Sequence, residues 1–213
     1  MKLYSYWRSS TSYRVRAALN LKRLNYEIVP VDLVAGDQRN EAYLALNPGA
    51  GVPTLVLEDG TALTQSLAIL DYLEAMQPQI RLIPTDPLKR ARVLAAAHTV
   101  AMDIHPVNNL RLLAELKTRF GATPEQLTDW MQHWMAAGFA TLETQLDDST
   151  PFAFGTAPDI ADLCIVAQLY NAHRWGLDLT PYPKLRRVET ACLSIPEIAA
   201  AHPDQQPDAK VTT

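Results

Sequence analysis

Three hydroxyl side chains, Ser9, Ser10 and Thr11, follow one another where a short strand candidate gives way to a helix candidate. In a packed core such residues would be costly, but at a helix N-terminus one of them can cap the helix. A hydroxyl there can also donate a hydrogen bond to a thiolate, which the helix dipole favours too, so the pKa of that thiol would fall below its usual value of about 8.5. A serine nucleophile is less expected, because no histidine–aspartate pair stands in a supporting motif.

Two further positions could bind an extended or anionic ligand. A cis Val52–Pro53 bond would leave the Val52 N–H and C=O able to pair with a peptide lying alongside, although a trans proline at a strand start is commoner. Ser66, directly after Gln65, opens a predicted helix, where its hydroxyl and the unpaired N–H groups suit a carboxylate. A plain N-cap serine is the commoner role. From the residues alone, the commoner roles are favoured: an ordinary trans proline at position 53 and a plain helix cap at Ser66.

Short strands and helices alternate in the first 80 residues. Their patterns predict a strand at 2–6, a helix at 12–24, a strand at 26–33, a hairpin at 51–66 and a helix at 66–78. The hairpin is indicated by Asp59-Gly60, a strong turn signal, and the second helix ends before Pro78. This order predicts a split α/β arrangement on one mixed sheet, with the size and pattern of a thioredoxin-like domain.

The rest of the chain is helical in pattern. Helices are predicted at 88–120, 123–147, 159–175 and 184–201, with Pro106 as a kink in the first. Residues 81–87 are predicted to be a linker, so that the domains are 1–80 and 88–213. The last twelve residues are polar and contain proline, and we expect a frayed or loosely docked tail.

Charge, apolar runs and cysteine spacing narrow the class of protein. The formal net charge of −4 over 213 residues gives no indication of bulk nucleic-acid or anionic-membrane binding. No apolar run approaches the roughly 20 residues of a membrane span, and no apolar leader follows Met1, so a cytoplasmic protein is expected. Cys164 and Cys192 are far apart and lie in no Cys/His cluster, which predicts buried reduced thiols and no metal site.

Several motifs together resemble the glutathione transferases. They are "VPTL" (52–55) before the hairpin, "QS" (65–66) at the next helix, and "DIADLCIVAQ" (159–168), which is similar to the family's capping box. Three longer stretches resemble the zeta class: "SSTSYRVRAALN" (9–20), "DIHPVNNLRLL" (103–113) and "NAHRWGLDLTPYPKL" (171–185). The resemblance covers nearly the whole chain and implies an α/β thioredoxin-like N-terminal domain followed by an all-α C-terminal domain.

The resemblance also implies an activity. Zeta enzymes of this kind are glutathione-dependent cis–trans isomerases, and the bacterial maleylpyruvate isomerases are the members this chain resembles most. The thiolate of glutathione adds to the cis double bond, the resulting single bond rotates, and elimination gives fumarylpyruvate. The implied partners are a small dicarboxylate keto-acid and a second copy of the chain in a homodimer.

The resemblance carries roles onto individual positions. Ser9 would donate to the thiolate, with Ser10 and Thr11 as the next candidates. The residues implied to bind the rest of glutathione are Gln65 and Ser66 (γ-glutamyl end), Val52 and Pro53 (cysteinyl backbone), Gln38 and Arg39 (glycyl end), and His105 and Asn109 from the helical domain. A dianionic substrate needs guanidinium groups, and the arginines implied to bind it are Arg8, Arg111 and Arg174. Arg14 and Arg16 are interpreted as structural or surface residues.

One departure and three alternatives remain. The signature's cysteine is Thr11 here, which removes thiol chemistry from this helix end and makes a side reaction on α-halo acids less expected. Maleylacetoacetate differs from maleylpyruvate by one methylene, which a pocket distinguishes by only about 1–3 kcal/mol. A general detoxifying transferase is one alternative, but it would need an apolar substrate pocket, and the arginines proposed to line the pocket argue against that. A non-catalytic interaction protein would often lack the hydroxyls that Ser9 and Ser10 retain.

Overall fold

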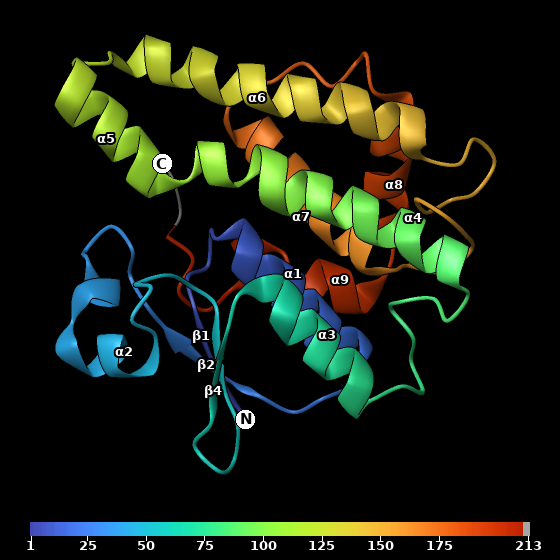
Figure 1. Ribbon diagram of the computed structural model, residues 1–213, viewed down its shortest axis with the longest axis horizontal. Helices are drawn as coiled ribbons and strands as arrows, with labels where there is room; N and C mark the ends of the chain where they lie inside the picture. The colour runs from blue at the N-terminus through green and yellow to red at the C-terminus, as the bar shows by residue number, and fades with distance from the viewer. Residues whose placement is uncertain (211–213) are drawn as a thin grey trace. The chain divides into compact units, whose positions relative to one another are not determined.

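The computed structural model describes residues 1–210 and contains two compact units (Figure 1). The first unit is Met1–Leu82 together with the C-terminal segment from Leu193 onward, and the second is Ile83–Cys192. The segment after Leu193 joins the first unit because its helix α9 (Pro196–Ala200) packs against α1 (Ser10–Leu21). The sequence had predicted a helical domain of residues 88–213, which includes this segment, whereas the structure groups the segment with the first unit. The exact domain boundaries stay a prediction.

The first unit is built on a four-stranded mixed sheet. Its strands are β1 (Lys2–Ser5), β2 (Glu27–Pro30), β3 (Thr54–Val56) and β4 (Ala62–Thr64), in the order β2-β1-β3-β4. β1 is parallel to β2 and antiparallel to β3, and β4 closes an antiparallel hairpin with β3. A parallel pair requires a crossover, and α1 supplies it. The pattern confirms the predicted thioredoxin-like α/β unit.

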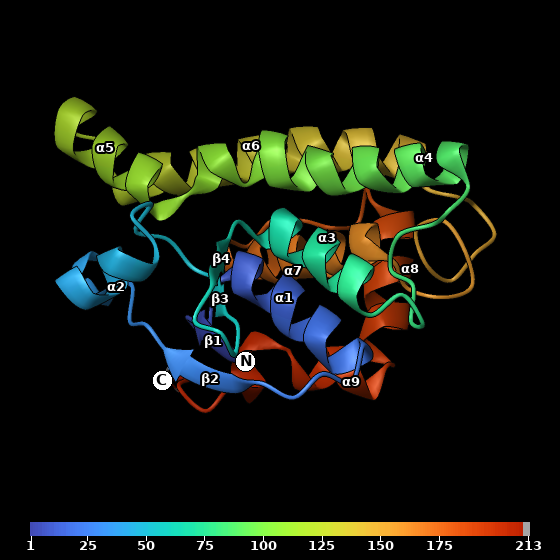
Figure 2. The ribbon, with the colours of Figure 1, turned by 60° about the horizontal axis from the view of Figure 1, so that its bottom comes forward.

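Two helices of the first unit lie side by side, α1 and α3 (Ser66–Met76), as Figures 1 and 2 both show. Each buries an apolar stripe, which includes Val15 and Leu19 on α1 and Leu70 and Leu73 on α3. The sequence missed two short helices between β2 and β3, namely η1 (Asp37–Arg39) and α2 (Glu41–Leu46).

A buried ion pair fixes the far ends of α1 and α3. Lys22 Nζ lies 2.8 Å from Glu74 Oε2 and also donates to the carbonyl oxygens of Gln77 and Ile80. Glu74 Oε2 in turn accepts the N–H of Leu82 at 2.9 Å. A buried charge pair is tolerated when its remaining donors and acceptors are satisfied, and the Lys22 ammonium meets that condition.

The described part of the C-terminal segment is docked. Trp7 donates its backbone N–H to Asp208 Oδ2 at 3.0 Å, and Lys210 Nζ lies 2.7 Å from Asp32 Oδ2. The prediction of a frayed or loosely docked tail was therefore wrong as far as residue 210, because side chains of the tail bind the first unit; residues 211–213 lie outside the described part.

The second unit is helical, as predicted. Its helical elements are α4 (Pro87–His98), the π-helical turn η2 (Thr99–Ile104), the 3₁₀ turn η3 (Pro106–Asn108), α5 (Leu110–Phe120), α6 (Pro124–Gln145), α7 (Ile160–Arg174) and α8 (Pro183–Leu193). The single kinked helix predicted at 88–120 is thus four elements, and the helix predicted at 184–201 is α8 followed by α9. Among residues 1–210, no helix combines the length and the apolar character needed to cross a membrane.

Candidate functional site

The three hydroxyls lie at the start of α1. Ser9 is the N-cap residue, and its Oγ accepts the N–H of Ser12 at 3.2 Å. Thr11 Oγ1 donates to the carbonyl oxygen of Val52 at 2.8 Å. Ser9 Oγ lies 2.8 Å from Thr11 Oγ1. Because a hydroxyl has one proton and that of Thr11 is given to Val52, Ser9 is the donor in this contact. Ser9 is therefore both a helix cap and a hydroxyl donor, while Ser10 is buried.

The loop that carries Val52 is held by buried polar side chains. Val52–Pro53 is cis. Asn47 Nδ2 donates to the Gly51 carbonyl oxygen at 2.8 Å, and the Tyr43 hydroxyl donates to the same oxygen. Burial raises the pKa of the Tyr43 hydroxyl, so it stays a neutral donor at neutral pH. These contacts fix the backbone immediately before Val52, and the α2 helix that supplies Tyr43 is one the sequence did not predict.

The start of α3 has no side-chain cap. Gln65 occupies the N-cap position with φ 66° and ψ 114°, makes no capping hydrogen bond, and is exposed. A non-glycine residue with this backbone conformation costs on the order of 1–3 kcal/mol. Ser66 is the first helical residue and is buried, and its Oγ accepts a hydrogen bond from Arg14 Nη1 at 3.3 Å. The first turn contains no acidic residue. This helix end is therefore able to take an anion.

The other predicted site residues of the first unit make fewer hydrogen bonds in the described residues. Gln38 Nε2 lies 3.4 Å from the Leu33 carbonyl oxygen, and Arg39 is exposed. Pro53 is buried. Arg8 is half-buried, and its guanidinium carbon lies 5.2 Å from the centroid of the Trp7 ring, a cation–π distance.

In the second unit, the predicted glutathione-binding residues His105 and Asn109 lie where η2, η3 and α5 meet. Asn109 is the N-cap of α5: its Oδ1 accepts the N–H of Arg111 at 3.1 Å, and its Nδ2 lies 3.5 Å from His105 Nε2. The side chain of Asn109 is thus engaged in local structure. The neighbouring Asn108, which sequence reasoning missed, is buried, and neither atom of its amide has a hydrogen-bond partner in the described residues.

Two of the predicted substrate-binding arginines belong to the second unit and are exposed. Arg111 lies in the first turn of α5, and Arg174 is the last residue of α7, with its guanidinium carbon 5.1 Å from the Trp175 ring centroid. The guanidinium group of Arg174 thus lies at cation–π distance from an aromatic ring, as that of Arg8 does.

Two carboxyl groups with raised pKa values lie away from these residues, at the start of α7. Asp159 and Asp162 form a reciprocal capping box and are both buried. Burial raises the pKa of Asp162 to about 6, in spite of the backbone N–H groups of Ala153 and Asp159 that it accepts. Burial and the neighbouring Asp162 charge raise the pKa of Asp159 as well. Because both carboxylates accept hydrogen bonds from backbone N–H groups, this cluster is a folding element, and it is the capping box that the motif at 159–168 predicted.

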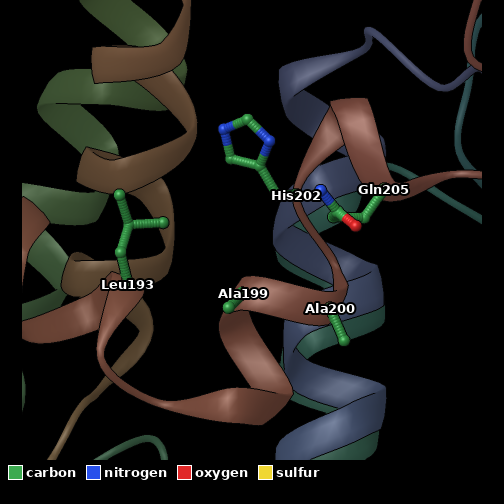
Figure 3. Close-up of a pocket in the computed structure, with 5 residues that line it drawn as sticks. All are labelled: Leu193, Ala199, Ala200, His202 and Gln205. Carbon is green, nitrogen blue, oxygen red and sulfur yellow. The ribbon is translucent and has the colours of Figure 1, made fainter.

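A separate surface pocket lies in the C-terminal segment and is lined by Leu193, Ala199, Ala200, His202 and Gln205 (Figure 3). It contains none of the predicted site residues. The His202 ring packs edge-on against Tyr13, and its Nδ1 accepts the N–H of Asp204 at 3.3 Å. His202 therefore serves to dock the segment.

Known proteins match nearly the whole chain. The family model for the glutathione S-transferase N-terminal domain matches residues 8–76, and the model for the C-terminal domain matches residues 124–190. Maleylacetoacetate isomerase of Pseudomonas aeruginosa is 45% identical over 210 residues, which covers 98% of each chain.

Two solved structures superpose closely. The holo structure of a maleylpyruvate isomerase, described as a bacterial zeta-class glutathione S-transferase, has a TM-score of 0.96 at 42% identity and covers 99% of this chain and 100% of that one. A maleylacetoacetate isomerase from Methylobacterium extorquens, with malonate and glutathione bound, has a TM-score of 0.95 at 40% identity, again over 99% and 100% of the two chains. The chain therefore belongs to the glutathione S-transferases, within the zeta-class family of maleylacetoacetate and maleylpyruvate isomerases.

Proposed function

We propose that the protein is a glutathione-dependent cis–trans isomerase that converts maleylpyruvate to fumarylpyruvate. The observation that carries this proposal is the hydroxyl chain from Ser9 through Thr11 to the Val52 carbonyl, since it links the proposed thiolate donor to the proposed peptide-binding loop. The relatives named as isomerases of maleyl keto-acids support the reaction class.

The donor set of the first unit fits glutathione. The tripeptide has a γ-glutamyl carboxylate, and the uncapped start of α3, with Ser66 and no acidic side chain in its first turn, suits such a group. Its extended middle suits the backbone of the fixed loop at Val52. Gln65 would hold the γ-glutamyl end with Ser66, while Gln38 would lie at the glycyl end.

When bound, glutathione supplies the thiolate that adds to the cis double bond and leaves after the bond has rotated. Ser9 would donate a hydrogen bond from its hydroxyl to this sulfur, for which the Ser9 hydroxyl would rotate away from Thr11. A donor at the start of α1 stabilises the anion over the thiol, so it lowers the pKa of the thiol. Ser10 is buried and Thr11 is committed to Val52, so Ser9 is the preferred catalytic hydroxyl of the three.

Arginines bind the dianionic substrate in this proposal. Arg8, Arg111 and Arg174 present planar guanidinium groups, which match carboxylates in a bidentate way. The malonate bound to the M. extorquens relative is a small dicarboxylate, which supports a site of this chemistry. His105 and Asn109 are proposed as further glutathione-binding residues.

The proposal includes two further features from the family. The protein forms a homodimer and is cytoplasmic, which suits its two buried thiols, Cys164 and Cys192. Light scattering after size-exclusion chromatography tests the dimer, for which a mass near that of one chain would be the contrary result.

The function is tested by binding to immobilised glutathione followed by an isomerase assay with maleylpyruvate and, separately, maleylacetoacetate. Binding with a higher kcat/KM for maleylpyruvate is expected. A higher value for maleylacetoacetate would change the substrate but not the reaction. Glutathione binding without isomerisation would instead indicate a general transferase, and the absence of binding would contradict every enzymatic interpretation.

A further inference from the structure

Helix α1 and its C-cap residue carry three buried cations, and these differ in how their charges are satisfied. Lys22 is paired with Glu74 and two carbonyl oxygens. Arg16 donates to the Ser5 hydroxyl and to the carbonyl oxygens of Trp7 and Ala201, each at 3.0 Å. Arg14 is only 1% exposed, yet within the described residues its sole hydrogen bond goes to Ser66 Oγ. Its Nε and Nη2 are buried with no acceptor in that part of the chain.

An uncompensated buried guanidinium is expensive, because burial removes the hydration of the charge and no carboxylate replaces it. Residues that lower stability in this way are expected where function requires them. The position of the Arg14 side chain indicates that its charge acts at the start of α3. Its Nη1 reaches the first residue of α3, where no side chain caps the helix and no acid lies in the first turn.

The Ser66 hydroxyl connects this charge to the helix end. Ser66 Oγ accepts from Arg14, and in residues 1–210 the Ser66 hydroxyl proton has no acceptor. That proton is therefore available to a ligand. A donor chain that begins at a cation is polarised, so the Ser66 hydroxyl becomes a stronger donor to an anion than an isolated serine would be.

We infer that Arg14 is a positioning residue for glutathione. Its positive charge polarises the Ser66 hydroxyl and makes the electrostatic potential at the start of α3 more positive, and this favours binding of the α-carboxylate of the γ-glutamyl residue. The inference rests on the proposed glutathione site. Arg14 is too deeply buried to be the carboxylate's direct ligand, so its effect passes through Ser66 and through the local potential. The ligand's carboxylate is the missing counter-charge of the buried guanidinium.

Calorimetric titration with two peptides tests this inference. The first is glutathione, and the second is γ-aminobutyryl-cysteinylglycine, which differs only in lacking the α-carboxylate. The wild type is expected to bind glutathione at least tenfold more tightly than the second peptide. Arg14→Met is expected to remove most of that preference by weakening glutathione alone, whereas Arg14→Lys retains part of it. Arg16→Lys is the matched control on the same helix and is expected to leave the preference unchanged.

Thermal unfolding of the ligand-free protein gives a second readout. A structural arginine would lower Tm when removed, whereas removal of an uncompensated charge leaves Tm unchanged or raises it. Equal weakening of both peptides by Arg14→Met, or a lower Tm with the preference intact, would overturn the inference and leave the proposed function standing. Failure of the wild type to bind glutathione at all would overturn the proposed function itself. If Arg14→Met does not fold, Arg14→Gln takes its place in both measurements.

Discussion

Ser9 Oγ and Thr11 Oγ1 lie 2.8 Å apart, and Ser9 is the donor because the proton of Thr11 is given to the Val52 carbonyl oxygen. Thr11 stands where the zeta-class signature has a cysteine, and it uses its hydroxyl to join the start of α1 to the loop before β3. The position therefore has a structural role in this chain.

The first prediction concerns this bridge. Thr11→Val keeps the side chain's shape and removes its hydroxyl, so the Val52 carbonyl and the Ser9 hydroxyl each lose a partner. We expect the KM for glutathione to rise about fivefold, which corresponds to a hydrogen bond of about 1 kcal/mol. Steady-state kinetics with varied glutathione measures it, with Thr11→Ser as the control that keeps the hydroxyl. Equal KM values for wild type and Thr11→Val would contradict the role.

The second prediction separates two neighbouring asparagines. Asn109 caps α5, so Asn109→Ala is expected to lower stability by about 1 kcal/mol. Asn108 is buried with both amide atoms unpaired in the described residues, and Asn108→Leu, which has a similar branched shape, is expected not to lower stability. We expect Asn108→Leu instead to reduce kcat/KM, because an unpaired buried amide is available to a ligand. Denaturation and kinetics of both variants test this, and a destabilised Asn108→Leu with normal kinetics would be the opposite result.

The third prediction concerns the substrate's carboxylates. Arg174→Ala and Arg8→Ala are each expected to raise the KM for maleylpyruvate roughly tenfold or more, since a hydrogen bond to a charged group contributes about 1.5–3 kcal/mol. The KM for glutathione should stay the same. The exposed Arg119, which pairs with Glu115 on α5, offers a control in Arg119→Ala. Loss of glutathione affinity with an unchanged KM for maleylpyruvate would indicate that these arginines bind glutathione and not the substrate.

The sequence predicted those elements whose signals are local. The capping box of Asp159 and Asp162 and the start of α3 at Ser66 follow from residue types at fixed spacing, and both are present. The π-helical turn η2 had no such signal, because it depends on packing: a Cβ on Gly138 of α6 would lie 2.2 Å from Ile104 Cγ1.

Part of the proposed site has a local signal as well. Ser9, Val52 and Ser66 were proposed from motifs, whereas the contact between Thr11 and Val52 spans 41 positions in the chain, which no local pattern encodes. Arg14 was interpreted as structural or surface, because a basic residue in a helix start gives no indication of burial. Its incomplete set of partners is visible only in three dimensions.

The fourth prediction is a pH dependence of stability. Burial raises the pKa of Asp162 from its ordinary 3.8 to about 6, so between these pH values the folded state retains a proton that the unfolded state has released. This contribution to the free energy of unfolding is fully present below pH 3.8 and is lost as pH rises through about 6. Asp159, raised in the same direction, adds to it.

Asp162→Asn cannot titrate at this position. We therefore expect the free energy of unfolding of the wild type, minus that of Asp162→Asn, to fall across this pH window by an amount on the order of 3 kcal/mol. Urea denaturation at a series of pH values measures the difference. A difference that stays constant, or grows as pH rises, would show that burial does not govern this carboxyl.

The central claim is that the start of α1 holds the sulfur of glutathione as an anion, with Ser9 as its donor. Titration of the thiolate's ultraviolet absorbance in the bound state, for the wild type and for Ser9→Ala, tests this most directly. For the wild type we expect a pKa at least one unit below the usual value of about 8.5, and for Ser9→Ala a pKa closer to that value together with a lower kcat. A bound thiol that titrates at its ordinary pKa in the wild type, or at the same pKa in both proteins, would contradict the account.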